Sequence, residues 1–465
     1  MKIKFCGADK NVTGSRHLIE INNKKILLDC GLFQGGFSRL EKHKMNNKFL
    51  FDPKKIDVVI LSHAHIDHAG NLPTLVKQGF KGKIYCTKPT IELLGVMLED
   101  SAKIQAQDVD YLKKRFEAVI EPLYSKVDVV HTLKKMVGVD YGQCFEVEEG
   151  CKATFYDAGH VLGSAQTLLE IKEGNKSYKL VYTGDLGRKN MPILNDPYQI
   201  LEADFLITES TYAEHIHDTF DYVFDEMKWA INDVVARGGK IIVPGFSLER
   251  TQELVYVLHK LYLDKKIPAV PIFVDSPMST KISKVFMNNV DYYDDQSFRD
   301  FLGRARSPFA FKNLKYITSV EESKKLNYYK GSCIIISASG MCNAGRIIHH
   351  LKHNIENPKN LILIIGYMAE GTLGRRIVEQ KRKVKIFGQY YNLKADVLAM
   401  NEFSAHADKL DLLANVQNMK KLKKVFIVHG EKFATSYLRD CIKNVLKFKG
   451  EVIVPELGEK IMIGS

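Results

Sequence analysis

The sequence lacks the features that build disulfide frameworks, thiolate metal sites and membrane spans. Its 465 residues include eight cysteines, but no two of them form a C-x-x-C pair, so we expect no thiolate zinc site. Several cysteines lie in apolar, strand-like runs, which favours small buried thiols in a reducing compartment. No apolar run approaches the roughly 20 residues that cross a bilayer, and residues 1–7 contain no signal-peptide core. We therefore expect a soluble, cytoplasmic protein with no membrane partner.

Low-complexity segments and long polar linkers are also missing, and the composition is that of a globular protein. The chain is longer than one hydrophobic core usually supports, which predicts two or three domains. Lys and Arg number 67 against 55 Asp and Glu, giving a net charge of +12. This balance suits a polyanionic partner such as nucleic acid, although a lysine-rich proteome would produce the same excess.

The most informative segment is residues 62–70, where four metal-ligand side chains occupy six positions. It follows residues 56–61, a short apolar run rich in β-branched residues that predicts a buried strand. The ligands would then lie on a loop at the carboxyl end of that strand. Imidazole and carboxylate suit Zn²⁺ or a similar ion, whereas a chance surface cluster is the alternative. The four residues are His63, His65, Asp67 and His68.

Three further polar residues follow predicted strands and lie beside a glycine. They are His160 after Gly159, Asp185 after Gly184, and His429 before Gly430. Glycine beside a ligand lets the backbone turn sharply and approach a metal closely. Together with the first cluster, these residues indicate a metal-dependent hydrolase.

From about residue 213 the pattern changes to repeated strand–turn–helix units. Strands are expected at 240–244, 333–337 and 361–365, which predicts a mostly parallel sheet with helices on both faces. Each strand leads through a Gly- or Ser-bearing turn to an arginine, an arrangement that suits phosphate binding. The alternative is that Gly and Ser simply form tight loops. The candidate contacts to a nucleic-acid backbone are Arg250, Ser337, Ser339, Arg346 and Arg375.

After about residue 385 the first pattern resumes, with functional-looking histidines again following strands. This indicates one metal domain interrupted by an insertion. We expect the metal domain over residues 1–212 and 391–465, and the inserted domain over residues 213–390.

Taken together, these motifs resemble the β-CASP nucleases of the metallo-β-lactamase superfamily, a group that includes the pre-mRNA 3′-end-processing endonuclease. The resemblance covers essentially the whole chain. It implies an α/β fold: a metallo-β-lactamase αββα sandwich interrupted by a β-CASP domain with a mostly parallel sheet and flanking helices. The matching residues are Asp29, the 63–68 cluster, His160, Asp185, Glu209, His406 and His429.

The resemblance also implies how these residues divide between two ions. His63, His65 and His160 would hold one ion, and Asp185 would bridge to the other. The second ion would be held by Asp67, His68 and His429. Seven ligands are too many for one tetrahedral zinc but suffice for two ions that share a carboxylate. Two zinc ions are expected, and manganese suits the same ligands.

The catalytic set implied by the resemblance is Asp67, His406, Glu209 and Asp29. His406 would be the general acid that protonates the leaving oxygen, with Glu209 hydrogen-bonded behind it. Asp29 would orient a ligand or a water molecule. Structural roles for His406 and Glu209 are the alternatives.

The expected function is metal-dependent hydrolysis of single-stranded RNA by a hydroxide that two metal ions activate, most simply as an endonuclease. His429 favours RNA, since the DNA-repair branch of the family has an apolar residue at that motif. A 5′-exoribonuclease, a DNA nuclease, a small-molecule hydrolase and a silent RNA-binding scaffold are the alternatives. A homodimer is compatible with the sequence, which leaves the choice of metal and the RNA targets open.

Overall fold

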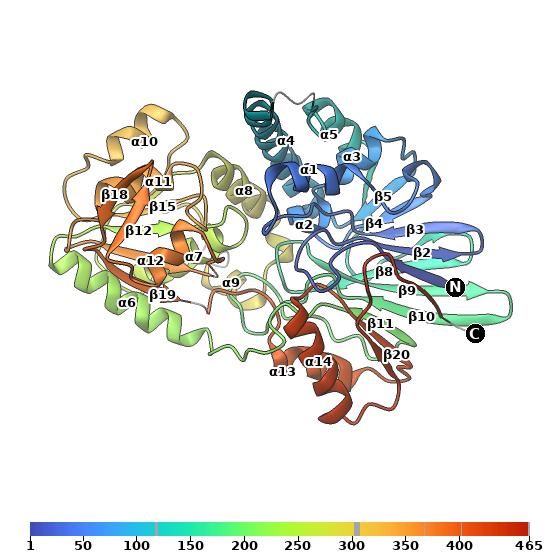
Figure 1. The fold of residues 1–465 in the computed structure, drawn as a ribbon. Coiled ribbons are helices and arrows are strands. Elements are labelled where there is room, and N and C mark those ends of the chain that lie inside the picture. Colours follow the sequence, from blue (N-terminus) through green and yellow to red (C-terminus); the bar gives the residue numbers. More distant parts are fainter. Residues whose placement is uncertain (117–119, 302–306, 367, 401, 464–465) are drawn as a thin grey trace. The chain divides into compact units, whose positions relative to one another are not determined.

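The chain forms two compact units in a computed structural model that describes residues 1–116, 120–301, 307–366, 368–400 and 402–463 (Figure 1). Unit 1 comprises residues 1–189, 195–216 and 405–465, and unit 2 comprises residues 190–194 and 217–404. The structure therefore divides the chain later than the boundary expected at residue 390.

Residues 391–404 belong to unit 2 because a strand in this segment joins that unit's sheet. Strand β19 (Asp396–Met400) pairs in parallel with β16 (Leu361–Ile365), from Asp396 opposite Leu361 to Met400 opposite Ile365. Sequence periodicity shows that a strand is present but not which sheet it extends.

Unit 1 contains two seven-stranded sheets. The first has the order β22-β1-β2-β3-β4-β5-β6, and the second has the order β21-β20-β11-β10-β9-β8-β7. The first comprises β1 (Lys2–Phe5), β2 (His17–Ile21), β3 (Lys24–Leu28), β4 (Val58–Ile60), β5 (Lys83–Cys86), β6 (Met136–Gly138) and β22 (Lys460–Met462). The second comprises β7 (Cys144–Glu148), β8 (Cys151–Asp157), β9 (Ala165–Glu173), β10 (Lys176–Tyr182), β11 (Phe205–Thr208), β20 (Lys424–Ile427) and β21 (Glu451–Ile453).

An apolar core fills the space between these two sheets. Phe5 and Phe426, from one sheet each, are buried there with ring centroids 5.4 Å apart. Helices cover the outer faces, with α13 and α14 packed on the second sheet (Figure 1). This is the expected αββα sandwich. Its helices are α1 (Arg39–Asn47), η1 (Pro53–Lys55), α2 (Ile66–Ala69), α3 (Leu72–Lys77), α4 (Lys88–Phe116), α5 (Lys126–Leu133), α13 (Lys409–Asn418) and α14 (Lys432–Asn444).

Unit 2 is built on a six-stranded sheet in which all the paired strands are parallel, in the order β14-β13-β15-β12-β16-β19. This confirms the expected parallel sheet. Its other strands are β12 (Ile241–Pro244), β13 (Ile272–Val274), β14 (Leu314–Tyr316) and β15 (Ile334–Ser337), and a separate hairpin joins β17 (Lys383–Ile386) to β18 (Gln389–Asn392). Its helices are α6 (Asp221–Ala236), α7 (Arg250–Leu263), α8 (Pro277–Asn288), η2 (Val290–Tyr292), α9 (Asp295–Asp300), α10 (Val320–Leu326), α11 (Ile347–Asn354) and α12 (Leu373–Val378).

The edge of unit 1 that matters for function is formed where neighbouring strands end. Strands β10, β11 and β20 are adjacent and parallel, so their carboxyl ends meet at one edge of the second sheet. Asp185, Glu209 and His429 come one to three residues after these strands. None of the helices in the described ranges is long and apolar enough to cross a membrane.

Candidate metal centre

The 63–68 cluster lies on a tight loop after β4 that continues into the short helix α2. The segment that follows β3 holds this loop closely: the Cys30 N–H donates to the His68 carbonyl at 2.7 Å. A Cβ atom on Gly31 would lie only 1.5 Å from the Asp67 carbonyl oxygen. Glycine at position 31 therefore allows the close backbone approach that places the cluster.

The first group of potential ligands brings three imidazoles to one carboxylate oxygen. The Nδ1 atom of His65 lies 3.1 Å from His63 Nε2 and 3.2 Å from His160 Nε2. Asp185 Oδ2 lies 3.5 Å from the Nε2 atoms of both His63 and His160. A tetrahedral zinc ion with bonds of about 2.0–2.1 Å holds its ligand atoms about 3.3–3.4 Å apart, so this spacing fits such an ion.

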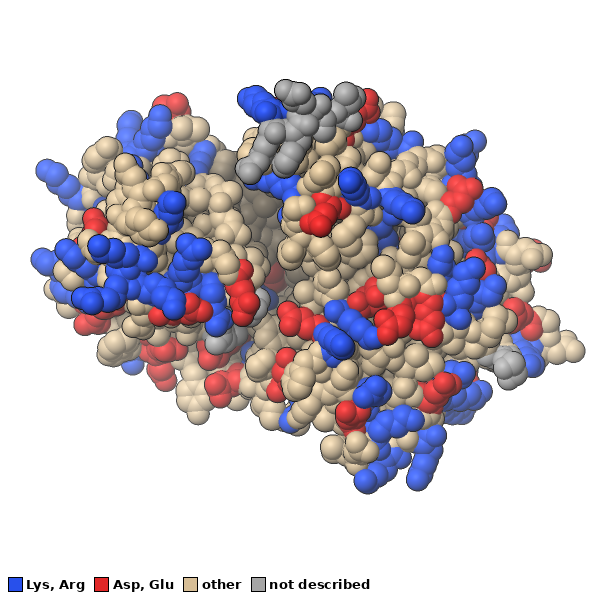
Figure 2. All heavy atoms as spheres, in the orientation of Figure 1, with Lys and Arg blue, Asp and Glu red and all other residues tan. Residues whose placement is uncertain are grey.

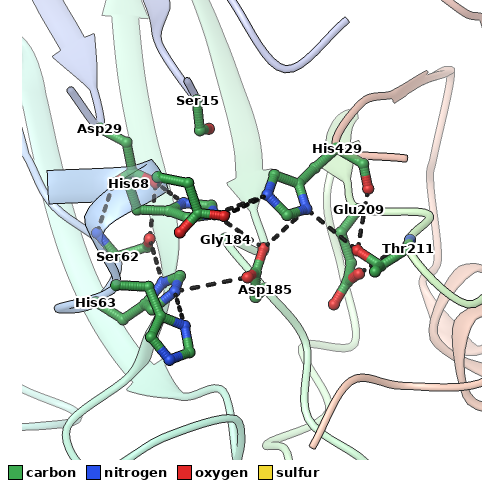
Figure 3. Close-up of polar contacts among 12 residues, drawn as sticks. Ser15, Asp29, Ser62, His63, His68, Gly184, Asp185, Glu209, Thr211 and His429 are labelled. Carbon is green, nitrogen blue, oxygen red and sulfur yellow. Dashed lines mark hydrogen bonds and ion pairs between the residues drawn. The ribbon is translucent and has the colours of Figure 1, made fainter. Parts of the chain in front are cut away.

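The second group brings Asp67, His68 and His429 together beside the first. The Nε2 atoms of His68 and His429 lie 3.1 Å apart, and His429 Nε2 lies 3.5 Å from Asp67 Oδ2. Asp185 Oδ1 lies 3.1 Å from His68 Nε2. Asp185 therefore turns one carboxylate oxygen toward each group, and Figure 3 shows His63, His68 and His429 directed toward it.

The electrostatics of the first group fit a bound cation. Burial lowers the pKa of His63 well below its usual value and that of His65 to about 4, so both rings are neutral near pH 7. Neutral imidazole is the form that binds metal. Burial alone would raise the pKa of Asp185, but His429 and His68 outweigh it and hold that pKa well below its usual value. Asp185 is thus ionised, and the donor set suits a divalent ion.

Asp29 lies behind the second group and orients it. Its Oδ2 accepts a hydrogen bond from His68 Nδ1 at 2.6 Å, which leaves His68 Nε2 facing the other donors. The Ser62 hydroxyl donates to the same oxygen at 2.7 Å and lies 2.9 Å from His63 Nδ1. Asp29 is therefore hydrogen-bonded directly to His68 and reaches the first group through Ser62. Sequence analysis did not single out Ser62, although it directly precedes the cluster.

Sequence analysis also missed three hydroxyl groups around the site. Tyr182, at the end of β10, donates from its hydroxyl to Asp29 Oδ2 at 2.6 Å, and Ser15 Oγ lies 3.0 Å from the same hydroxyl. Thr211 Oγ1 lies 3.1 Å from His429 Nδ1. The only signal in the sequence is proximity, since Tyr182 and Thr211 each lie within three residues of a predicted site residue.

Glu209 and His406 form the expected pair. His406 Nδ1 lies 3.1 Å from Glu209 Oε1, and the Glu209 side chain is fully buried while that of His406 is 18% exposed. The Glu209 carboxylate also accepts backbone N–H bonds from Leu186 at 2.7 Å and Thr211 at 3.1 Å. These bonds fix the carboxylate, which in turn fixes the orientation of the imidazole.

His406 reaches the site because its segment pairs with the loop after β10. His406 and Gly187 form an isolated antiparallel bridge, and the Ala407 N–H donates to the Leu186 carbonyl at 2.7 Å. The His406 ring centroid consequently lies 4.4 Å from that of His160. The expected acid is therefore in contact with the first group of ligands.

The five candidate RNA contacts lie in unit 2, whereas every residue of the metal clusters lies in unit 1. Arg346 is held inside its own unit: its Nη1 lies 2.7 Å from Asp275 Oδ1, and its guanidinium also donates to two backbone carbonyls. The Ser337 hydroxyl donates to the Asp275 carbonyl oxygen at 3.0 Å. Their side chains thus already have partners near the ends of β13 and β15.

The other two arginines also have acidic partners. Arg250 Nη1 lies 2.9 Å from Glu253 Oε2, and Arg375 Nε lies 2.8 Å from Glu379 Oε1. The Ser339 carbonyl accepts the Cys342 N–H in the turn after β15. Contact of these residues with RNA remains a prediction.

Comparison with known families assigns the whole architecture. Residues 13–245 match the metallo-beta-lactamase superfamily, residues 251–377 match the Beta-Casp domain, and residues 390–455 match the Zn-dependent metallo-hydrolase RNA specificity domain. A solved Enterococcus faecalis protein of unknown function shares the fold, with a TM-score of 0.56, 13% identity and 99% of both chains covered.

Curated relatives align with this chain over nearly its full length. A ribonuclease of Thermus thermophilus is 34% identical over 93% of both chains, and an RNase J-like protein of Methanocaldococcus jannaschii is 30% identical over 96% of both. The cleavage and polyadenylation specificity factor 73 of Drosophila melanogaster is 28% identical over 94% of this chain and 61% of the fly protein. With its two ligand groups joined by Asp185 and its inserted parallel sheet, the chain belongs to the β-CASP family of metallo-β-lactamase-fold hydrolases.

Proposed function

We propose that this protein is a ribonuclease that hydrolyses phosphodiester bonds in single-stranded RNA, cutting within the strand. The observation that carries the proposal is the Asp185 carboxylate, which turns one oxygen toward each of two histidine-rich groups. Relatives named as ribonucleases and the match to an RNA specificity domain support RNA as the substrate.

Two divalent ions fit the two ligand groups, with zinc favoured by the three imidazoles of the first. His63, His65 and His160 would hold one ion, and Asp185 would contact both. Bound there, divalent ions would polarise the phosphate and lower the pKa of a bound water toward neutrality. Asp67, His68 and His429 complete the second ion's ligands in this proposal.

Within the chain, His406 and Glu209 would handle the proton that the leaving oxygen requires. Glu209 accepts the hydrogen bond from His406 Nδ1, which leaves Nε2 as the atom that can transfer a proton. The partial exposure of His406 lets a substrate oxygen approach it.

The proposal is tested by incubating the zinc-loaded protein with 5′-labelled single-stranded RNA. An Asp67→Ala/His68→Ala variant serves as the comparison, with its metal content measured. Internal fragments that the variant does not produce are expected. Mononucleotides released from the 5′ end would indicate a 5′-exonuclease instead of an endonuclease. Absence of cleavage by the fully loaded protein would overturn ribonuclease activity and favour a small substrate or a binding scaffold.

The role of His406 gives a separate prediction. His406→Ala should lower kcat for RNA cleavage by about 10²–10⁴-fold, because that is the usual contribution of a positioned acid, and should leave the bound metal unchanged. His131→Ala is the matched control, since His131 is an exposed histidine on α5 of the same unit. Loss of metal from the His406 variant would instead assign this residue to the ligand set.

A further inference from the structure

The hairpin β17–β18 of unit 2 presents a basic and aromatic face that the metal chemistry does not use. Its two strands pair in antiparallel register and are joined by Phe387 and Gly388, with φ values of 48° and 83°. Positive φ at both positions is the signature of a type I′ turn, which matches the twist of the flanking strands. The hairpin is therefore a regular element rather than an irregular loop.

The alternation of side chains separates two faces of this hairpin. Val384 and Ile386 are each 1% exposed and pack into the apolar core of unit 2. Because side chains alternate along a strand, Lys383 and Lys385 point to the opposite, solvent-facing side. Tyr390 lies directly across from Lys385, with the Lys385 ammonium 5.9 Å from its ring centroid.

The cations on and beside this face have no acidic partner among the residues that the structure describes. Glu379 pairs with Arg375 and Lys381. Within the described ranges of the chain, no carboxylate lies within salt-bridge distance of Arg382, Lys383 or Lys385. Figure 2 shows Lys and Arg gathered over the region where Figure 1 labels α12. We call Arg382, Lys383, Lys385, Phe387 and Tyr390 the hairpin patch.

Two large rings are exposed among these cations. Phe387 is 57% exposed and Tyr390 is 70% exposed. Phe387 also occupies a positive-φ turn position at which Asn or Gly is favoured, so it is not there to ease the turn. Unpaired cations interleaved with exposed rings are what single-stranded nucleic acid binds, through phosphates and stacked bases.

We propose that the hairpin patch is a second contact for the RNA strand that the metal centre cleaves. The inference rests on the proposed function and deepens it by adding a binding surface in unit 2, separate from the ligand groups in unit 1. The segment 378–389 lies between the two matched family stretches that end at residue 377 and begin at residue 390. Those matches therefore do not account for most of the patch.

The test compares Arg382→Gln/Lys383→Gln/Lys385→Gln with Lys443→Gln/Lys447→Gln/Lys449→Gln. The control removes three exposed lysines at the end of α14 and just after it, so the net charge changes equally. Binding of a labelled 30-nucleotide single-stranded RNA is measured by fluorescence anisotropy over a range of salt concentrations. Both triplets are placed in the zinc-loaded His406→Ala protein so that cleavage does not intervene.

The hairpin triplet should bind RNA about tenfold more weakly than the control, and the slope of log affinity against log salt should fall by about 2, since each phosphate contact on a single strand contributes about 0.7. Tyr390→Ala should weaken binding severalfold while leaving the salt slope unchanged, because it removes stacking and no charge. With His406 restored, kcat/KM should fall for the 30-mer and not for bis(p-nitrophenyl) phosphate.

Equal affinities and equal salt slopes for the two triplets would overturn the inference. This outcome is distinct from failure of the proposed function, which would appear as no RNA cleavage by the wild-type protein. Equal melting temperatures of the variants confirm that a loss of binding does not reflect unfolding.

Discussion

At the scale of single residues, the ligand groups are held by side chains that lie behind them. Asp29 is fully buried and accepts four hydrogen bonds, two of them from Ser62 and one from His68. The fourth comes from Tyr182. Burial and the charge of Asp29 raise the pKa of the Tyr182 hydroxyl well above its usual value, so this hydroxyl stays protonated as a donor. Tyr182 therefore acts on the orientation of His68 through Asp29.

Removal of the Tyr182 hydroxyl should therefore weaken metal binding. We expect Tyr182→Phe to lower zinc affinity by about 10-fold, within the range seen when groups behind a ligand are lost. Competition with a zinc chelator measures the change. Tyr124→Phe is the matched control, because Tyr124 is also fully buried in unit 1 and donates its hydroxyl to Ser101 at 2.7 Å. Equal affinity in both variants would show that Tyr182 does not position the site.

At the scale of elements, the site is assembled from loops that follow different strands. The loops after β8 and β10 pack so closely that a Cβ atom on Gly187 would lie 1.9 Å from the Gly159 carbonyl oxygen and 2.7 Å from the His160 nitrogen. The same Gly187 forms the bridge to His406. A side chain at this position must push the His160 loop and the His406 segment apart.

Gly187→Ala should consequently lower both zinc affinity and RNA cleavage, each by at least tenfold, while the protein still unfolds cooperatively. Zinc titration and initial cleavage rates measure the two effects. Gly95→Ala is the control, because a Cβ at that helical position meets no atom within 4 Å and alanine favours a helix. Unchanged zinc affinity in the Gly187 variant would mean that the loops adjust without moving His160.

At the scale of the whole molecule, we expect metal binding to stabilise unit 1. The described ligand groups join segments as distant as His63 and His429, and none of their members lies in unit 2. A ligand at 1,000 times its Kd stabilises the state that binds it by about 4 kcal/mol. Chelation of the metal should therefore speed amide exchange in β4 and β20 far more than in β15 and β16. The exchange is measured by mass spectrometry. Equal acceleration in all four strands would show that the units unfold together.

Much of this site could be predicted from the sequence because the ligands follow strands with clear apolar patterns. Residues 58–60 form β4 as expected, and the clustered histidines come directly after it. The internal partner of Arg346 could not be predicted, because Asp275 reaches Arg346 only through the pairing of β13 with β15. The sheet that residues 396–400 join could not be predicted either, since a strand pattern does not indicate which strand it pairs with.

The sequence by itself determined which residues can bind metal and which chemistry they suit, because ligand type and spacing are local properties of the chain. Only the tertiary structure decided that the two oxygens of Asp185 face different ligand groups, and that Tyr182 and Thr211 support those groups. These facts depend on contacts between segments far apart in the chain, such as Tyr182 with Asp29 and Thr211 with His429. Such contacts follow from how sheets and loops pack, which no local pattern encodes.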